Sequence, residues 1–244
     1  MNPAIKRTFC DFAVLWRAVL MRNPRVNNGL EWHSQCLTSL MTIALPLRIC
    51  ICALWLFAVG AGTVVILDYQ NTSGSVGVTP EHWPLGTQLT FDHNRDTLLM
   101  FAHPQCPCTR ASMEELNRLL AQCNGRVVAH VFFFKPGNLP HDWTQTGLWR
   151  SAASIPGVTV QEDIDDTLAR KFGAETSGYV LLYDTRGQLL FRGGITAGRG
   201  HAGDNAGESA IVSLITGQNT NLRQTPVYGC SLLGKACLRP GVAK

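Results

Sequence analysis

The pattern of hydrophobic and polar positions separates one long apolar stretch from a region of short alternating elements. Between Arg48 and Asp68 the chain reads ICICALWLFAVGAGTVVIL, without a carboxylate or an ammonium group. A helix of this length covers roughly 28 Å, close to the hydrocarbon thickness of a bilayer. A buried core helix of similar length normally keeps a polar stripe, and this stretch has none. The pattern predicts a transmembrane helix at 47–68.

Downstream, apolar runs of strand type alternate with amphipathic helical runs. TLLMFA and RVVAHVFFF have the composition of buried strands, and CTRASMEELNRLLAQC between them places its apolar residues on one helical face. A parallel crossover followed by an antiparallel hairpin and a helix predicts an α/β fold with a mixed sheet and flanking helices. The expected elements are a strand at 97–102, a helix at 108–123, a strand at 126–134, a helix at 143–154, a strand at 157–160, a helix at 164–172, two strands within 179–194 and a helix at 205–216.

Charge is distributed unevenly about the apolar stretch. The net charge is +4, and residues 1–48 hold six basic and two acidic side chains, whereas the rest of the chain holds fifteen of each. So mild a balance does not indicate nucleic-acid binding. Because the basic residues flank the N-terminal side of the stretch, the positive-inside rule places the N-terminus in the cytoplasm. We therefore expect a single-pass protein of the cytoplasmic (inner) membrane with its domain in the periplasm or another extracytoplasmic space.

A cleaved signal peptide is the competing interpretation of the N-terminal region. The apolar stretch is longer than a usual signal h-region and no clear cleavage site follows it, so we expect an uncleaved anchor. A start at Met41 or Met21 is a further hypothesis, since the segment from Met41 needs nothing upstream. The expected organisation is a cytoplasmic segment at 1–46, the anchor at 47–68, a Gly/Ser/Thr/Pro-rich linker at 69–90, a folded domain at 91–218 and a cysteine-containing tail at 219–244.

Two cysteines lie where a predicted strand is followed by a predicted helix. In FAHPQCPCTRAS, Cys106 and Cys108 flank Pro107 at the start of the helix. The unpaired N–H groups and the positive dipole end of a helix N-terminus stabilise a thiolate and lower the cysteine pKa. Thiols in an oxidising compartment form disulfides or take part in chemistry. The pattern predicts a redox or metal-binding thiol site.

The segment around these cysteines resembles the thioredoxin fold, whose members place active cysteines at the first strand-to-helix junction. Over about residues 90–217 the chain is similar to the membrane-anchored bacterial thioredoxin-like family called RedB, through MFAHPQCPCTRAS, FGAETSGYVLLYDTRGQLLFRGGIT, RGHAGDN and VYGCSL. The chain departs from thioredoxin in having C-x-C in place of C-x-x-C, and Ser177-Gly178 in place of a cis-proline. A disulfide between positions i and i+2 is strained, so a stable resting Cys106–Cys108 bond is not expected.

Cys230, His201 and His103 complete the set of candidate catalytic residues. Cys230 supplies a third thiol for exchange with the Cys-Pro-Cys pair, and the alternative, weighted equally, is a structural Cys230–Cys237 disulfide. His201, in the Gly-rich stretch before the last helix, is a candidate proton donor, thiolate stabiliser or metal ligand, or a solvated loop residue. His103 is close to the cysteines along the chain and is a candidate for tuning their reactivity.

These features predict a membrane-anchored thiol–disulfide oxidoreductase without a cofactor, acting on protein thiols or disulfides and served by an unidentified redox partner. The alternative is a carrier of copper or another soft metal that binds the ion through Cys106, Cys108 and His201. Peroxide scavenging is less favoured, since position 103 holds His where the peroxiredoxin pattern has Thr. No nucleic-acid partner is expected, because the aromatic residues lack interleaved basic residues.

Overall fold

The structure of the chain is a computed structural model that describes residues 30–232, with side chains described from residue 45 onward. The chain divides into two compact units, Met1–Val65 and Ile66–Lys244. Met21 and Cys237, which enter the sequence hypotheses, lie outside the described residues. The start residue and the Cys230–Cys237 pairing therefore stay predictions.

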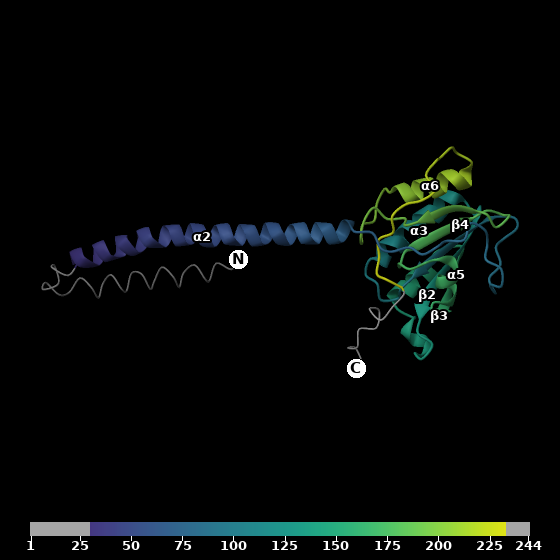
Figure 1. Cartoon of the computed structure of the whole chain (residues 1–244), viewed down its shortest axis with the longest axis horizontal. Coiled ribbons are helices and arrows are strands. Elements are labelled where there is room, and N and C mark those ends of the chain that lie inside the picture. The colour runs from purple at the N-terminus through teal and green to yellow at the C-terminus, as the bar shows by residue number, and fades with distance from the viewer. Residues whose placement is uncertain (1–29, 233–244) are drawn as a thin grey trace, which may run out of the picture. The chain divides into compact units, whose positions relative to one another are not determined.

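A long apolar helix precedes the folded domain along the chain. α2 (Leu30–Asn71) is helical over 42 residues and includes Pro46 (Figure 1). Its segment Leu45–Asn71 has 27 residues and a mean hydropathy of 2.5, and its side chains are not buried. This length and composition are sufficient to cross a bilayer. The prediction of one such helix near the N-terminus is confirmed, and the expected anchor at 47–68 lies inside it.

A five-stranded mixed sheet organises the domain, in the spatial order β3–β2–β1–β4–β5 (Figure 1). β1 pairs in parallel with β2, and β2 pairs in parallel with β3, whereas β4 runs antiparallel to both β1 and β5. Two parallel crossovers followed by an antiparallel hairpin make this a thioredoxin-like fold, as the sequence predicts. The strands are β1 (Asp96–Ala102), β2 (Val127–Lys135), β3 (Val158–Ile164), β4 (Tyr179–Tyr183) and β5 (Leu189–Gly193).

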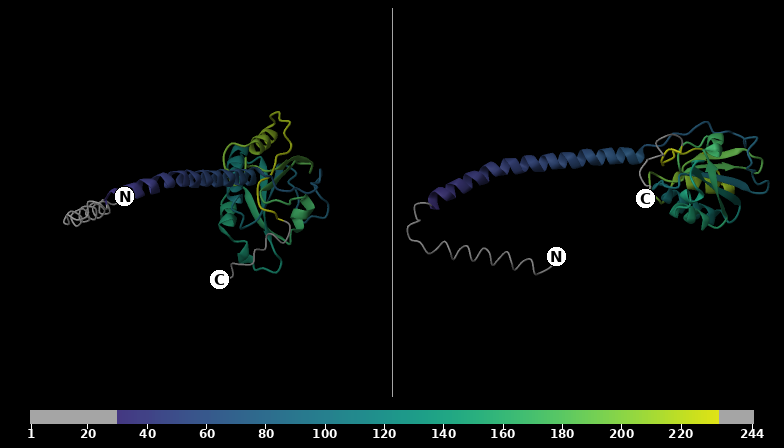
Figure 2. Two further views of the ribbon diagram at one scale, coloured as in Figure 1. Left: turned by 60° about the vertical axis from the view of Figure 1, so that its left-hand side comes forward. Right: turned by 90° about the horizontal axis from the view of Figure 1, so that it is seen from below.

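Helices cover both faces of the sheet (Figure 2). α3, α4 and α6 contribute to the hydrophobic cluster on one face, and α5 contributes to the cluster on the other. The two clusters share β1, because successive strand residues point to opposite faces. The helices are α3 (Thr109–Cys123), the 3₁₀ helix η1 (His141–Trp143), α4 (Gly147–Ala153), α5 (Thr167–Phe172) and α6 (Ala206–Thr216).

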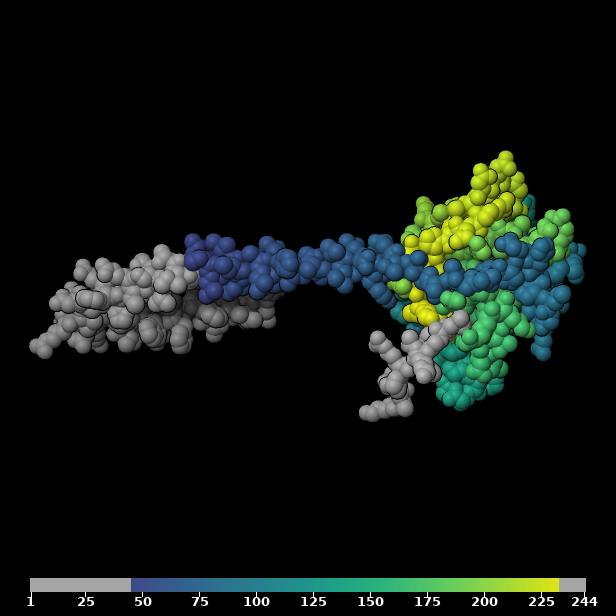
Figure 3. Space-filling model, in the orientation of Figure 1, coloured from purple at the N-terminus to yellow at the C-terminus, as the bar shows by residue number. Residues whose placement is uncertain are grey.

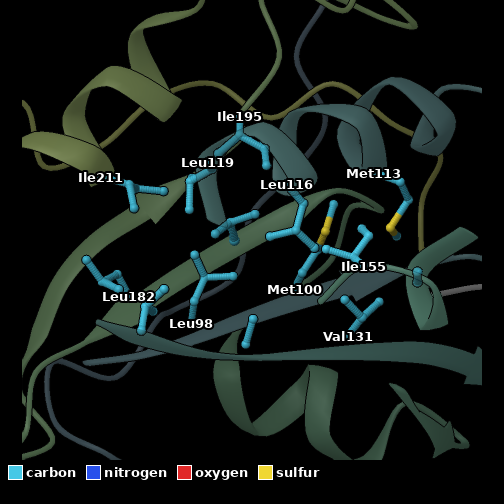
Figure 4. Packing of buried hydrophobic residues seen from close by; sticks show 14 of the residues in the cluster. Leu98, Met100, Met113, Leu116, Leu119, Val131, Ile155, Leu182, Ile195 and Ile211 are labelled. Carbon is cyan, nitrogen blue, oxygen red and sulfur yellow. The ribbon is translucent and has the colours of Figure 1, made fainter. Parts of the chain in front are cut away.

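The core explains why β1 is apolar throughout. Leu98 and Met100 belong to the cluster with Leu116 and Leu119 of α3, and all four side chains are fully buried (Figure 4). Leu99 and Phe101, between them in the sequence, belong to the opposite cluster. A strand covered on both faces needs apolar side chains at every position, which is why TLLMFA does not alternate.

Two predicted helix boundaries differ from the structure. The helix expected at 143–154 is divided into η1 and α4. The buried Thr144 hydroxyl donates to the main-chain oxygen of His141 and to the carboxylate of Glu162 in β3, at 2.8 and 2.6 Å. These bonds link the chain to the sheet and compete with a continuous helix.

The helix expected at 164–172 is α5, which begins at Thr167 and not at Ile164. β3 extends to Ile164 because its pairing with β2 continues that far. The buried Asp163 carboxylate then accepts the main-chain N–H groups of Leu168 and Ala169, both at 2.8 Å. Asp163 thereby satisfies N–H groups that the helix itself leaves without partners.

The stretch expected to act as a linker, 69–90, differs from that expectation because part of it packs onto the domain. Trp83 lies 5.2 Å, between ring centroids, from both Phe172 and Tyr183. Thr79 is buried and hydrogen-bonds the hydroxyl of Tyr179 at 2.6 Å. Figure 3 shows this segment on the surface of the domain. The apolar surface of Trp83 favours packing over a free tether.

Candidate thiol site

The turn between β1 and α3 positions Cys106. The Cys106 N–H donates to the main-chain oxygen of His103 at 3.1 Å, and the Thr109 N–H donates to that of Cys106 at 3.2 Å. α3 begins at Thr109, so Cys108 occupies its N-cap position. The structure thus places the cysteines at the strand-to-helix junction that the sequence predicts.

Cys106 and Cys230 are the cysteines that the fold brings into contact. Their Sγ atoms are 2.9 Å apart although 124 positions separate them in the sequence. Both are free thiols, and Cys106 is only 1% exposed. A disulfide has an S–S distance of about 2.05 Å, so the two atoms need to approach only slightly when an oxidant removes two electrons and the protons leave. Of the pairings left open by the sequence, this one is preformed.

Cys230 is held in place by a C-terminal strap, which we define as residues 226–232. The main-chain oxygen of Cys230 accepts the N–H of Ser177 at 2.8 Å, and the N–H of Leu232 donates to Glu175 at 2.7 Å. An antiparallel bridge joins Thr176 to Ser231 between them. The buried side chains of Val227 and Leu232 attach the strap to the core. Main-chain pairing of this kind sets the register of Cys230 opposite Cys106.

Ser177 links the strap to the helix that carries the cysteines. Its hydroxyl accepts the N–H of His103 at 2.8 Å and lies 2.7 Å from the Thr109 hydroxyl. Between residues 30 and 232 every peptide bond is trans. Ser177-Gly178, expected at the position of a cis-proline, therefore uses trans geometry and a side-chain hydroxyl to hold the loop beside the site.

The surroundings of the cysteines favour a thiolate at Cys106. A hydrogen bond from the Cys230 thiol lowers the pKa of Cys106 well below its ordinary value, and hydrogen bonds from Thr109 add to this effect against the opposing effect of burial. The same contact, together with burial, raises the pKa of Cys230. Burial and the nearby Cys106 raise the pKa of Cys108, while Arg199 lowers it. These effects favour the thiolate at Cys106 and the protonated thiol at Cys108 and Cys230.

We expect Cys106 in the reduced full chain, held in detergent, to ionise with a midpoint well below about 8.5, the value for a free cysteine. The measurement is the ultraviolet absorbance of the thiolate against pH, with the Cys106→Ser curve subtracted. Since Cys230 donates the leading hydrogen bond, Cys230→Ala should raise the midpoint. A midpoint near about 8.5 that Cys230→Ala leaves unchanged would contradict this assignment.

His103 lies at the site, buried at 5% exposure. Its ring packs against Phe134 and Trp143, and its Nδ1 atom accepts the N–H of Gln105 at 3.2 Å. Burial lowers the pKa of His103, and the nearby Cys106 partly offsets this effect by raising it. The imidazole is therefore neutral with its proton on Nε2, a buried atom that has no hydrogen-bond partner among the described residues.

His201 lies on an exposed turn. Its Nδ1 atom is 3.0 Å from the main-chain oxygen of Arg199, and its N–H donates to Gly198 at 3.3 Å. None of its contacts in residues 45–232 is with a cysteine. Over the same residues, no group of three or more His, Cys, Asp or Glu side chains is placed to hold a metal ion. The expected combination of Cys106, Cys108 and His201 is therefore not assembled.

Thr109 and Ser177 contribute to the site in ways that sequence reasoning missed. Thr109 follows the Cys-Pro-Cys motif, and its position on the first turn of the predicted helix was the available signal. No local pattern indicated that the Ser177 hydroxyl would bond to the turn before Cys106, because the two are brought together by the β1–β4 pairing.

Gly229 allows the strap to approach the sheet closely, and we expect Gly229→Ala to displace Cys230. An added Cβ would overlap the main-chain oxygen of Ser177, which cannot move away easily. The yield of Cys106–Cys230 disulfide under limiting oxidant should fall by about tenfold, the effect of losing one or two net hydrogen bonds. Quantitative mass spectrometry measures this yield. Gly147→Ala is the matched control, since a Cβ there meets no atom within 4 Å; equal yields in the two variants would contradict the prediction.

Comparisons with known proteins leave the family open. No family model and no curated protein matches the chain. A hypothetical protein from Sinorhizobium meliloti 1021 is 19% identical, with 67% of this chain and 96% of that chain covered and a TM-score of 0.48. An uncharacterized conserved protein from Geobacillus kaustophilus is 18% identical, with 68% of this chain and 95% of that chain covered and a TM-score of 0.48. A secreted Mycobacterium tuberculosis disulfide oxidoreductase homologous to E. coli DsbE is 14% identical, with 51% of this chain and 82% of that chain covered and a TM-score of 0.37.

At these identities and TM-scores the likenesses carry no functional argument. The class of the protein rests on its own sheet order and on the junction at which its cysteines lie. The chain has a thioredoxin-like domain, and the cysteines at its first strand-to-helix junction face a third cysteine from the C-terminal strap.

Proposed function

We propose that the chain is a membrane-anchored, extracytoplasmic thiol–disulfide oxidoreductase of RedB type, with Cys106 as nucleophile and Cys230 as resolving cysteine. The observation that carries the proposal is the 2.9 Å contact between their sulfur atoms. Hydrogen bonding that lowers the pKa of Cys106 supports it, because the thiolate is the attacking species in disulfide exchange.

The proposed reaction passes two electrons from the protein to a substrate disulfide. The Cys106 thiolate attacks one substrate sulfur, a mixed disulfide forms, and the other substrate sulfur leaves as a thiolate. Cys230 then loses its proton to that thiolate or to solvent and attacks the Cys106 sulfur. The mixed disulfide breaks, the second substrate thiol is released, and a Cys106–Cys230 disulfide remains. A protein dithiol returns the two electrons and regenerates the starting state.

The electrostatics of the pair suit this order of events. The negative charge on Cys106 is one reason why the pKa of Cys230 is raised. Once Cys106 is part of a mixed disulfide that charge is gone, so the Cys230 thiol ionises more easily when it is needed. Cys108 is the less suitable resolving residue, since an i to i+2 disulfide is strained.

The two candidate histidines, His103 and His201, differ in how their positions support a role at the sulfur atoms. His103 is buried beside Cys106, and its unpartnered Nε2–H group is a candidate hydrogen-bond donor that would stabilise a leaving thiolate. His201 contacts its own turn, so its position supports no direct role at the sulfur atoms. For the same reason the structure offers no observation in favour of copper carriage, the alternative from the sequence.

The proposed topology places the N-terminus in the cytoplasm and the domain outside the membrane. The basic residues before the apolar helix and the helix itself support it. A reporter fused after residue 232 should be active only if it is of the type that works outside the cytoplasm.

Disulfide mapping tests the proposed chemistry. The full chain in detergent is oxidised with limiting glutathione disulfide, alkylated and analysed by peptide mass spectrometry. We expect the Cys106–Cys230 linkage to dominate, and Cys123→Ala, which removes a buried cysteine of α3, to behave like the unmutated chain. A dominant Cys106–Cys108 or Cys230–Cys237 linkage would overturn the assignment of the resolving cysteine.

A further inference from the structure

Arg199 connects three segments that meet around the thiol site. Its side chain donates to the main-chain oxygens of Tyr69 and Thr72 at 3.1 and 3.2 Å, and to that of Gly229, the residue before Cys230. The guanidinium also lies 4.7 Å from the centre of the Tyr69 ring. A planar guanidinium presents five N–H donors in a fixed arrangement, and an ammonium group cannot reproduce these contacts together.

Among the residues whose side chains are described, no carboxylate forms an ion pair with Arg199. Between residues 45 and 232 the ion pairs involve other basic side chains, and the oxygen atoms around the Arg199 guanidinium are main-chain carbonyls. The guanidinium reaches the main-chain oxygen of Gly229, next to Cys230, and its positive charge lowers the pKa of both Cys108 and Cys230 against the larger effects that raise them. Its charge is therefore available to a thiolate.

We propose that Arg199 is a positioning residue for the thiol site: its hydrogen bonds lock the C-terminal strap over Cys106, and its charge is directed at Cys108. This inference rests on the proposed function and deepens it. The first role depends on the shape of the guanidinium and the second on its charge alone. Lysine keeps the charge and loses the planar donor group, so two substitutions separate the roles.

The first measurement tests whether Arg199 holds the strap in place, through the stability of the Cys106–Cys230 disulfide. The full chain in detergent is equilibrated with mixtures of reduced and oxidised glutathione, and the fraction with a Cys106–Cys230 disulfide is determined by mass spectrometry. Because both Arg199→Lys and Arg199→Met lose the contact with Gly229, each should lower the equilibrium constant for disulfide formation at least about fivefold. A constant equal to that of the unmutated chain in both variants would overturn the first role.

The second measurement follows Cys108, through its rate of alkylation by iodoacetamide against pH, with the product located by mass spectrometry. Arg199→Met should lower the rate at a fixed pH near neutrality by about tenfold, which corresponds to a midpoint shift of one pH unit. Arg199→Lys should stay close to the unmutated chain. The second role would be overturned if the alkylation rate of Cys108 depended on pH in the same way in Arg199→Met and in the unmutated chain. It would also be overturned if Arg199→Lys lowered this rate as much as Arg199→Met does.

The controls distinguish this inference from the proposed function. Arg110→Met removes an exposed positive charge two residues from Cys108 and should change neither measurement. Arg199→Gln replaces Arg199→Met should the latter fail to fold. Alkylation of Cys108 is also measured on the fully reduced chain. There the effect of the Arg199 charge on Cys108 is tested without any contribution from the Cys106–Cys230 disulfide. Absence of the Cys106–Cys230 disulfide from the unmutated chain would contradict the proposed function, whereas its presence with unaltered Arg199 variants would contradict only the role of Arg199.

Discussion

Cys106→Ser should reduce the turnover of insulin or a small disulfide by at least about 100-fold, because serine cannot form the thiolate that attacks a disulfide. Cys230→Ser should keep the first step and lose the second, so that mixed disulfides between Cys106 and the substrate accumulate. Cys108→Ser should retain most of the activity, since Cys108 is a protonated thiol outside the preformed pair. The measurements are steady-state turnover and mass spectrometry of trapped intermediates.

The matched control for this series is Cys123→Ala. Cys123 lies fully buried at the end of α3, and burial raises the pKa of its thiol to about 11, so it is inert at neutral pH. Its replacement should leave turnover within about twofold, apart from a cavity cost to stability. Activity retained in Cys106→Ser and lost in Cys108→Ser would reverse the assignment of the nucleophile.

Glu115→Ala should destabilise the domain by about 1.5–3 kcal/mol, the cost of removing a buried carboxylate that accepts hydrogen bonds. Glu115 is fully buried in α3, and its carboxylate accepts the Gly203 N–H at 2.7 Å and the Asn205 side-chain amide at 3.1 Å, besides pairing with Arg118. Removal takes the carboxylate acceptor from the Gly203 N–H and one of three acceptors from the Asn205 side-chain amide. Unfolding of the full chain in detergent, followed by tryptophan fluorescence against urea, measures the effect.

The neighbouring Glu114 provides the control, because it is exposed on the same turn of α3. Glu114→Ala should change the free energy of unfolding by less than about 0.5 kcal/mol. Burial and the nearby Glu115 raise the pKa of Glu208 to about 7, so Glu115→Ala should also lower that pKa. Equal unfolding free energies for the two alanine variants would show that the buried network contributes no stability.

Local sequence patterns predicted the elements of the domain well. Hydrophobic periodicity placed β1, α3, β2 and α6 close to their observed bounds, because each buries one face or both against a single core. The β2–β3 pairing carried β3 to Ile164, and a side-chain bond from Thr144 divided the helix expected at 143–154. Both differences arise from contacts with a neighbouring strand, which periodicity within one segment does not encode.

The segments before and after the domain were harder to predict. The composition of Gln70–Pro84 is typical of a linker, yet Trp83 packs against aromatic rings from α5 and β4. The strap at 226–232 reads as an irregular tail, yet main-chain hydrogen bonds join it to the loop before β4. In each case the binding surface is assembled from residues distant along the chain.

By itself, the sequence determined that a long apolar helix precedes an α/β domain and that Cys106 and Cys108 lie at a strand-to-helix junction. These features depend on neighbours within a few residues, through periodicity, length and the electrostatics of a helix terminus. Only the tertiary structure decided that Cys106 meets Cys230, that His201 contacts its own turn and that Arg199 joins the strap to the site. The Cys106–Cys230 contact joins segments 124 positions apart through the fold of the whole domain, and cysteine spacing alone leaves every such pairing open.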